Sequence, residues 1–301
     1  MAALLPLLPR VAAAEVAQMG VSEAAPGVFV HVGKYALVNA ENGGDISNAC
    51  CILGTSAVAI IDTGGSYRVG KALLEAIQQI TDKPIRYIIN THMHPDHVLG
   101  NAAFEGIGAE FIGHHNLPAA LAARAESYLR NARERIGDEG FAGTKIVLPT
   151  KLVTDTLDLD LGGRRLTLKA RPTAHTNNDL TIFDSATKIF FLGDLLFSGH
   201  IPTLDGSIVG WLKLIPELMR EKAARAIPGH GPRSMPWPQA ILAEQRYLET
   251  IARDVRAMIK DGKTIDEAIA SAGQTERGKW QLFDEHNGMN VTAAFTELEW
   301  E

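Results

Sequence analysis

The chain has 301 residues, of which 46% are hydrophobic and 21% are charged, and its formal net charge is −6 at pH 7. These proportions are those of an ordinary globular protein, and the negative balance gives no electrostatic reason to expect nucleic acid or an anionic membrane as a partner. No apolar run reaches the ~18 residues that a membrane-spanning helix needs.

The N-terminus differs from the rest of the chain. A short apolar core at 2–8 is followed by Ala12, Ala13 and Ala14, an order that resembles the end of a secretory signal with a small-residue cleavage site. The basic region that should precede the core is missing. Two expectations stay open: residues 1–14 are a signal-peptide remnant of a periplasmic or secreted protein, or they are an Ala-rich tail of a cytoplasmic one.

The first half of the chain predicts strands that alternate with helices. Apolar residues three or four positions apart indicate a helix at 69–80, and short apolar runs bounded by turn residues indicate strands. In chain order the expected elements are strands 28–32 and 35–39, a strand pair in "NACCILG" and "AVAIIDTGG", helix 69–80, strands 85–90 and 110–112, and helix 117–136.

The second half repeats this pattern. "TLDLDLGGRRLTLKA" predicts a hairpin with one wet face, and "DLTIFDSATKIFFLGD" predicts a second hairpin whose return strand is apolar enough to be buried on both faces. Residues 237–301 read as helices, one opening at Thr264 and another near Asn290. We expect one α/β domain over 15–301, with two sheets packed face to face and helices outside.

A group of metal-binding residue types follows the apolar run at 85–89. "INTHMHPDHVLG" contains four of them within six positions: His92, His94, Asp96 and His97. A mononuclear catalytic zinc site typically uses about three protein ligands and a water, so four indicate more than one metal. Three more residues of metal-binding types lie at the ends of later predicted strands: His175, Asp194 and His230.

In this order the seven residues resemble the metal-binding pattern of the metallo-β-lactamase superfamily. The resemblance covers roughly 28–231 and implies an αβ/βα four-layer sandwich, in which two mixed β-sheets pack face to face with a dinuclear metal site between them. It assigns the first metal to His92, His94 and His175, the second to Asp96, His97 and His230, and a bridging role to Asp194. It also implies that Asp62 supports the histidine loop; Asp62 can instead, or in addition, cap a helix.

The chemistry of these ligands agrees with two Zn²⁺ ions, although iron and manganese are not excluded. Zinc lowers the pKa of bound water to about 7, so a hydroxide is available at neutral pH. The resemblance therefore implies a metal-dependent hydrolase whose hydroxide attacks an ester, lactone, thioester or lactam carbonyl, with Asp96 as a catalytic residue that orients the hydroxide. A β-lactamase side activity is expected.

A narrower resemblance spans nearly the whole chain. "PIRYIINTHMHPDHVLGNAAF", "FIGHHNLPAAL" and the tail "GKWQLFDEHNGMNVTAAFTELEWE" are similar to the quinoprotein relay system zinc metallohydrolases. That family is exported and functionally linked to quinoprotein dehydrogenases, which implies the same for this chain. The competing functions are an accessory carrier for a quinone cofactor and a redox site.

Other residues are weaker candidates. Substrate contacts are expected from Asn178, His115 and Trp211, although His115 can equally lie on the surface and packing between helices is favoured for Trp211. "ENGGDIS" is interpreted as a flap over the metals. The arginines of helix 117–136 are interpreted as a solvated face that an anionic substrate could still approach, and His286 as structural.

Overall fold

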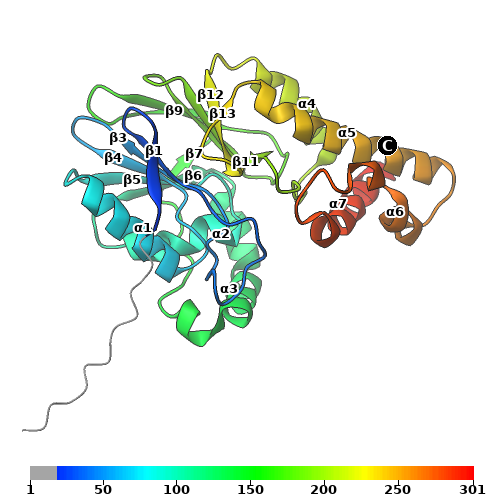
Figure 1. Cartoon of the computed structure of the whole chain (residues 1–301), viewed down its shortest axis with the longest axis horizontal. Helices are drawn as coiled ribbons and strands as arrows, with labels where there is room; N and C mark the ends of the chain where they lie inside the picture. The colour runs from blue at the N-terminus through cyan, green and yellow to red at the C-terminus, as the bar shows by residue number, and fades with distance from the viewer. Residues whose placement is uncertain (1–18) are drawn as a thin grey trace, which may run out of the picture.

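The computed structural model describes residues 19–301, so the expected signal remnant at 1–14 lies outside the described residues. Two mixed β-sheets face each other, and helices cover the outer face of each sheet (Figure 1). This is the four-layer α/β arrangement that the sequence predicts. No helix within 19–301 is both long enough and apolar enough to cross a membrane.

The first sheet contains β1 (Val21–Ala25), β2 (Val28–His31), β3 (Ala49–Leu53), β4 (Val58–Ile61), β5 (Ile85–Ile89), β6 (Glu110–His114) and β7 (Lys151–Val153). They lie side by side in chain order, antiparallel from β1 to β4 and parallel from β4 to β7. The parallel part brings the carboxyl ends of β4, β5 and β6 to one edge of the sheet.

The second sheet contains β8 (Thr156–Asp160), β9 (Arg165–Ala170), β10 (Leu180–Asp184), β11 (Ile189–Phe197), β12 (Arg225–His230) and β13 (Met235–Pro236). Its order is β13-β12-β11-β10-β9-β8, and only the β11–β12 pair is parallel. Both predicted hairpins are confirmed as β8–β9 and β10–β11. All nine residues of β11 are buried, as its unbroken apolar sequence predicts.

The helices are α1 (Tyr67–Ile80), α2 (Pro95–Val98), α3 (Leu117–Phe141), α4 (Ile208–Met219), α5 (Leu242–Lys260), α6 (Ile265–Ser271) and α7 (Phe283–Leu298), with 3₁₀ turns η1 (Leu99–Phe104), η2 (Gln239–Ile241) and η3 (Gln274–Glu276). In Figure 1, α1, α2 and α3 lie on the side of the first sheet, and α4 to α7 lie on the side of the second. The predicted helical character of 237–301 is confirmed, with Thr264 as the N-cap of α6.

Three apolar layers hold the sandwich together. Val30 and Ile52 of the first sheet meet Leu168 and Phe191 of the second in a core between the sheets. A second layer joins the first sheet to α1, and a third joins the second sheet to α4 to α7. The site described below lies at one edge of the central layer, where polar residues replace the apolar core.

Two expected elements are wrong. Residues 35–39 form no strand, because the Asn39 side chain accepts the backbone N–H groups of Glu41 and Asn42 and fixes a turn, which competes with pairing in a sheet. No helix opens at Asn290, which lies inside α7; its side chain donates to the Pro202 carbonyl at 2.7 Å and accepts the Leu204 N–H at 2.9 Å.

Candidate metal centre

The seven ligand-type residues come from five different segments. His92 and His94 lie in the loop after β5, and the short helix α2 carries Asp96 and His97. The remaining three lie on the second sheet: His175 between β9 and β10, Asp194 inside β11, and His230 as the last residue of β12. Asp194 lies inside β11, at an irregularity of the β11–β12 pairing, rather than at the strand end where the sequence predicts it.

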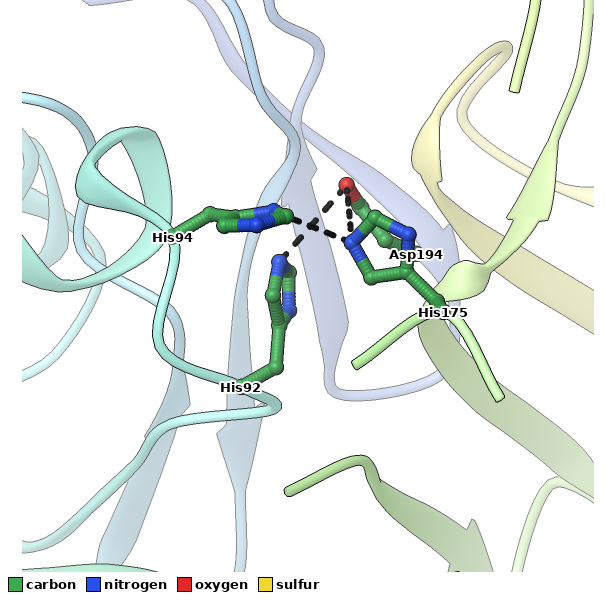
Figure 2. A group of neighbouring side chains, drawn as sticks. All are labelled: His92, His94, His175 and Asp194. Carbon is green, nitrogen blue, oxygen red and sulfur yellow. Dashed lines mark hydrogen bonds and ion pairs between the residues drawn. The ribbon is translucent and has the colours of Figure 1, made fainter. Parts of the chain in front are cut away.

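The first group consists of His92, His94, His175 and Asp194, whose ligand atoms all lie within 4.8 Å of one another. Figure 2 shows the three rings and the carboxylate pointing toward one another from both sides of the site. His94 Nδ1 is 3.0 Å from His175 Nε2, and Asp194 Oδ2 is 3.5 Å from that same Nε2 atom. His92 Nε2 lies 3.7 Å from Asp194 Oδ2.

The second group consists of Asp96, His97 and His230, with the same spread of 4.8 Å. His230 Nε2 is 3.2 Å from Asp96 Oδ2 and 3.4 Å from Asp194 Oδ2. His97 Nε2 is 3.2 Å from Asp194 Oδ1. The Asp194 carboxylate therefore contacts both groups, and the structure brings all seven predicted residues to one place.

Hydrogen bonds on the far side of the rings determine which nitrogen faces inward. His175 Nδ1 lies 2.7 Å from the Thr203 carbonyl, and His230 Nδ1 lies 2.9 Å from the Ile46 carbonyl. A carbonyl oxygen only accepts, so each Nδ1 carries the hydrogen. In a neutral ring the inward Nε2 atom is then unprotonated and carries a free lone pair, which is the form that binds metal.

His94 has the opposite orientation. Its Nε2 lies 3.0 Å from Asp205 Oδ2, so Nε2–H donates outward and Nδ1 faces the site. Arg124 of α3 holds Asp205 through two hydrogen bonds of 2.7 and 3.0 Å. The lone pairs of His94 Nδ1 and His175 Nε2 therefore face each other across 3.0 Å. This contact is favourable only when a proton or a metal ion lies between the two nitrogens.

Asp62 organises the opposite side of the site. It follows β4, and it accepts the Thr91 backbone N–H at 2.8 Å, the Thr91 hydroxyl at 2.7 Å and His97 Nδ1–H at 2.8 Å. Since the Thr91 hydroxyl donates to Asp62, its oxygen is free to accept from His92 Nδ1 at 3.0 Å. The helix-cap alternative is wrong, because Ser66 caps α1.

The residues present fit a metal. His92 Nε2, His97 Nε2 and Asp194 Oδ1 are buried and have no hydrogen-bond partner among the described residues. A buried polar atom without a partner is costly, so three of them pointing into one site indicate a cation-binding site. Imidazole nitrogen and carboxylate oxygen are ligand atoms that zinc binds. Hydrogen bonds from the outward nitrogen of each ring, like those described above, orient histidine ligands toward a metal.

The charges of the site give the same indication. Burial and the neighbouring imidazoles lower the pKa of His175 to about 3, and burial also lowers that of His92. Burial alone would lower the pKa of His230, but the carboxylates of Asp194 and Asp96 outweigh it and raise the pKa to about 9. Without a cation, the carboxylates hold protons on the second group, and a metal would displace them.

Two glycines allow the two sheets to close around the site. A Cβ atom at Gly229 would lie 1.9 Å from Asp194 Oδ1, and a Cβ atom at Gly193 would lie 2.6 Å from the Thr91 side chain. Gly193 also has φ of 53°, a region that favours glycine. Larger residues at either position would displace Asp194 or the histidine loop.

A cavity of about 120 Å³ opens onto the metal groups. Its lining comes from three regions: the loop after β2, the metal-site residues with their surroundings, and the helices α3 and α7. Asn178, His115 and Trp211 do not line it. Asn178 is buried and bonded to its neighbours, His115 is exposed beside Val153, and Trp211 packs in α4 behind His175, with ring centroids 5.4 Å apart.

Sequence reasoning missed several residues of this region. Asp205 and Arg124 had no visible link, because 81 positions separate them, and "TLDGS" reads as an ordinary turn. His286, expected to be structural, lines the cavity. The "ENGGDIS" segment is bonded in place: the Ile46 carbonyl binds His230, and the Ser47 hydroxyl donates to the Asp96 carbonyl.

Comparisons with known proteins agree with this geometry. The profile of the metallo-beta-lactamase superfamily matches residues 42–230, which include all seven ligand-type residues. Human acyl-coenzyme A thioesterase MBLAC2 is 25% identical over 219 residues, covering 62% of this chain and 74% of the relative.

Two solved structures share the fold. A metallo-beta-lactamase from Pontibacter korlensis superposes with a TM-score of 0.63 at 18% identity, covering 77% of this chain and 99% of its own. The sec-alkyl sulfatase PisA1 has a TM-score of 0.68 at 15% identity, covering 93% of this chain and 50% of its own. None of these three is named as a quinoprotein-associated hydrolase, and that narrower resemblance stays a prediction.

Proposed function

This chain belongs to the metallo-beta-lactamase superfamily and is a metal-dependent hydrolase, and we propose that it binds two zinc ions and hydrolyses an ester, lactone, thioester or lactam. One observation carries the dinuclear proposal. Inward-facing nitrogen lone pairs form two separate groups, and the Asp194 carboxylate contacts both of them, with one oxygen 3.2 Å from His97 Nε2 and the other 3.5 Å from His175 Nε2.

When bound, the metals supply a water ionised near neutral pH and polarise the substrate carbonyl. The chain's own residues do the positioning. Asp96 is the most accessible carboxylate of the ligand set, with 14% of its side chain exposed, and it lines the cavity. We assign to Asp96 the orientation of the attacking water, in addition to its role as a ligand. Asp62, Asp205 and the backbone carbonyls hold the rings in place.

A thioester is the first substrate class to test. The human relative is named as an acyl-coenzyme A thioesterase, which supports a carboxylic thioester as substrate for this chain. A low β-lactamase activity is part of the proposal, since a metal hydroxide that attacks a thioester carbonyl can also attack a strained lactam.

The test combines metal analysis with a substrate panel. Purified protein is expected to contain two zinc ions per chain and to hydrolyse members of a thioester, ester, lactone and β-lactam panel. Activity should disappear on chelation and return with Zn²⁺. His94→Ala should lose metal and activity, whereas the matched control His115→Ala, which removes an exposed imidazole, should retain both.

The same experiment separates the rival functions. Zinc-loaded protein that binds a quinone cofactor tightly and hydrolyses nothing would favour the carrier function. A coloured centre that changes its spectrum on reduction would favour a redox role and would contradict the hydrolase proposal. Iron or manganese at full occupancy would contradict the choice of zinc.

Export and a functional link to quinoprotein dehydrogenases also belong to the proposal. They rest on the sequence of residues 1–14 and on the narrower family resemblance. N-terminal sequencing of the protein recovered from the periplasm of the producing cell tests export. A mature N-terminus near residue 15 is expected, whereas recovery of uncleaved chain in the cytoplasm would contradict it.

A further inference from the structure

The cavity over the metal groups has one cationic side chain that the metal chemistry does not use. Arg135 of α3 is the only lysine or arginine among the residues that line it. It is exposed, and it takes part in none of the ion pairs found within 19–301. Its neighbours on the same helix are paired: Arg124 with Asp205, Arg130 with Glu126, and Arg133 with Asp138.

The position of Arg135 is held by the local fold. Ala132 and Ile136, on either side of it, are buried, so this turn of α3 is anchored to the core. The helix is interrupted immediately afterwards at Gly137, where φ is 74°. Arg135 therefore reaches the cavity from a packed turn, and its guanidinium group offers five N–H donors without a partner.

His286 reaches the same cavity from α7. Its ring centroid is 5.3 Å from that of His200, which in turn is 5.1 Å from that of His230. The Nδ1 atom of His286 is buried and has no hydrogen-bond partner within 19–301. Arg135 and His286 line this one cavity, the first from α3 and the second from α7. His286 therefore brings a hydrogen-bonding ring to the cavity that the cationic Arg135 also lines.

An apolar side chain completes the cavity. Leu37, in the loop after β2, lines it with 44% of its surface exposed, and Val38 lies beside it. The loop is ordered by Asn42, whose side chain donates to the Leu37 carbonyl at 2.8 Å and accepts the N–H of Asn39 at 3.1 Å. A large exposed apolar residue on an ordered loop at a site mouth is suited to contact the hydrocarbon part of a substrate.

We propose that Arg135 and His286 form a subsite for a negatively charged group on the substrate, while Leu37 contacts its apolar part. This inference rests on the proposed function and narrows its substrate class to anionic amphiphiles: carboxyl derivatives that carry a second, negatively charged group. The metal groups act on the scissile bond, and Arg135 binds the negatively charged group elsewhere on the same substrate. The alternative is that Arg135 is only a solvated surface residue, in which case its removal would not change substrate preference.

The first experiment compares two esters of matched length. Para-nitrophenyl glutarate carries a free carboxylate, and para-nitrophenyl pentanoate does not. Arg135→Ala should lower kcat/KM for the glutarate ester about tenfold, mainly through KM, which corresponds to ~1.4 kcal/mol. It should change kcat/KM for the pentanoate ester less than about twofold, since no charge is recognised there. Arg135→Lys should recover part of the loss.

Matched variants separate this role from a structural one. Arg130→Ala removes an exposed arginine one turn away on the same helix and should leave both substrates unaffected. His286→Ala should reduce the preference for the glutarate ester and keep the full zinc content, because His286 is not a metal ligand. Equal losses for both esters in Arg135→Ala, or no loss for either, would overturn the proposal.

A binding measurement keeps the inference independent of turnover. Hexanesulfonate, a poor zinc ligand, is titrated into the zinc-loaded protein by calorimetry, and Arg135→Ala should weaken its binding at least about fivefold while Arg130→Ala should not. If hexanesulfonate binds as expected but no ester is hydrolysed, the proposed function fails and the anion subsite stands. If esters are hydrolysed but Arg135→Ala changes neither kcat/KM for the glutarate ester nor the affinity for hexanesulfonate, the subsite proposal fails and the hydrolase proposal stands.

Discussion

Replacing Asp205 with alanine tests the argument that ring orientation creates the metal site. Asp205 Oδ2 accepts from His94 Nε2 at 3.0 Å and thereby turns Nδ1 of that ring into the site. Without this acceptor, His94 can rotate or change its tautomer, and the inward lone pair is no longer held in position. Loss of such an outer partner typically weakens metal affinity about 10- to 100-fold, or ~1.4–2.7 kcal/mol.

The effect on folding should be smaller. The Asp205 side chain is 30% exposed and that of Arg124 is 42% exposed, so solvent screens their ion pair. We expect Asp205→Ala to lower the free energy of unfolding of the metal-free protein by less than about 1 kcal/mol. Arg124→Ala should weaken metal binding less than Asp205→Ala, because Arg124 acts on His94 only through Asp205.

Competition with a chromophoric chelator measures the zinc affinity, and urea unfolding of metal-free protein measures the stability. Asp254→Ala is the matched control, since its side chain is 25% exposed and also pairs with an arginine, but on α5. It should leave zinc affinity unchanged. Unchanged affinity in Asp205→Ala, or an equal loss in Asp254→Ala, would refute the assignment of His94 Nδ1 as the inward nitrogen.

Three further predictions follow from the packing and the charges. Removing zinc with a chelator should lower the melting temperature, because a ligand that binds only the native state stabilises it, by ~2.7 kcal/mol at about 100 times its Kd; calorimetry should show no such shift in His94→Ala. Trp211→Ala should cost about 3–5 kcal/mol in urea unfolding, since Trp211 is fully buried, and a smaller cost would contradict its packing role. Asp184→Asn should cost about 3 kcal/mol, because it leaves the buried Arg164 guanidinium unpaired. Burial opposes ionisation of Asp184, but its bonds with Arg164 and Thr187 lower its pKa, so its stabilising effect is complete above about pH 4 and is lost as pH falls further; a wild-type advantage that grows on acidification would show that this sign is wrong.

Local patterns were sufficient for most elements. Helix 69–80 was predicted from apolar spacing, and α1 starts two residues earlier because Ser66 accepts the Val69 N–H and caps it. The burial of β11 on both faces follows from its nine consecutive residues, of which all but Gly193 and Asp194 are apolar. These predictions succeed because periodicity and capping are properties of neighbouring residues.

Residues 35–39 show where local patterns fail. Their continuous apolar run suits a strand, but β2, the strand before them, already pairs with β1 on one side and β3 on the other. Asn39 and Asn42 then form side-chain bonds to the backbone instead. Leu37 consequently faces the cavity, which no strand prediction would indicate.

The sequence alone determined the chemistry of this protein: three imidazoles and a carboxylate within "HMHPDH", and three more ligand types at later strands, are sufficient to indicate a metal site, because ligand chemistry belongs to the residue itself. Only the tertiary structure decided which nitrogen of each ring faces inward and which groups surround the metals. His94 and Asp205 are 111 positions apart, and Arg135 and His286 line one cavity only because α3 and α7 both reach it. Such contacts depend on how the two sheets and their helices pack, and packing is a property of the whole chain.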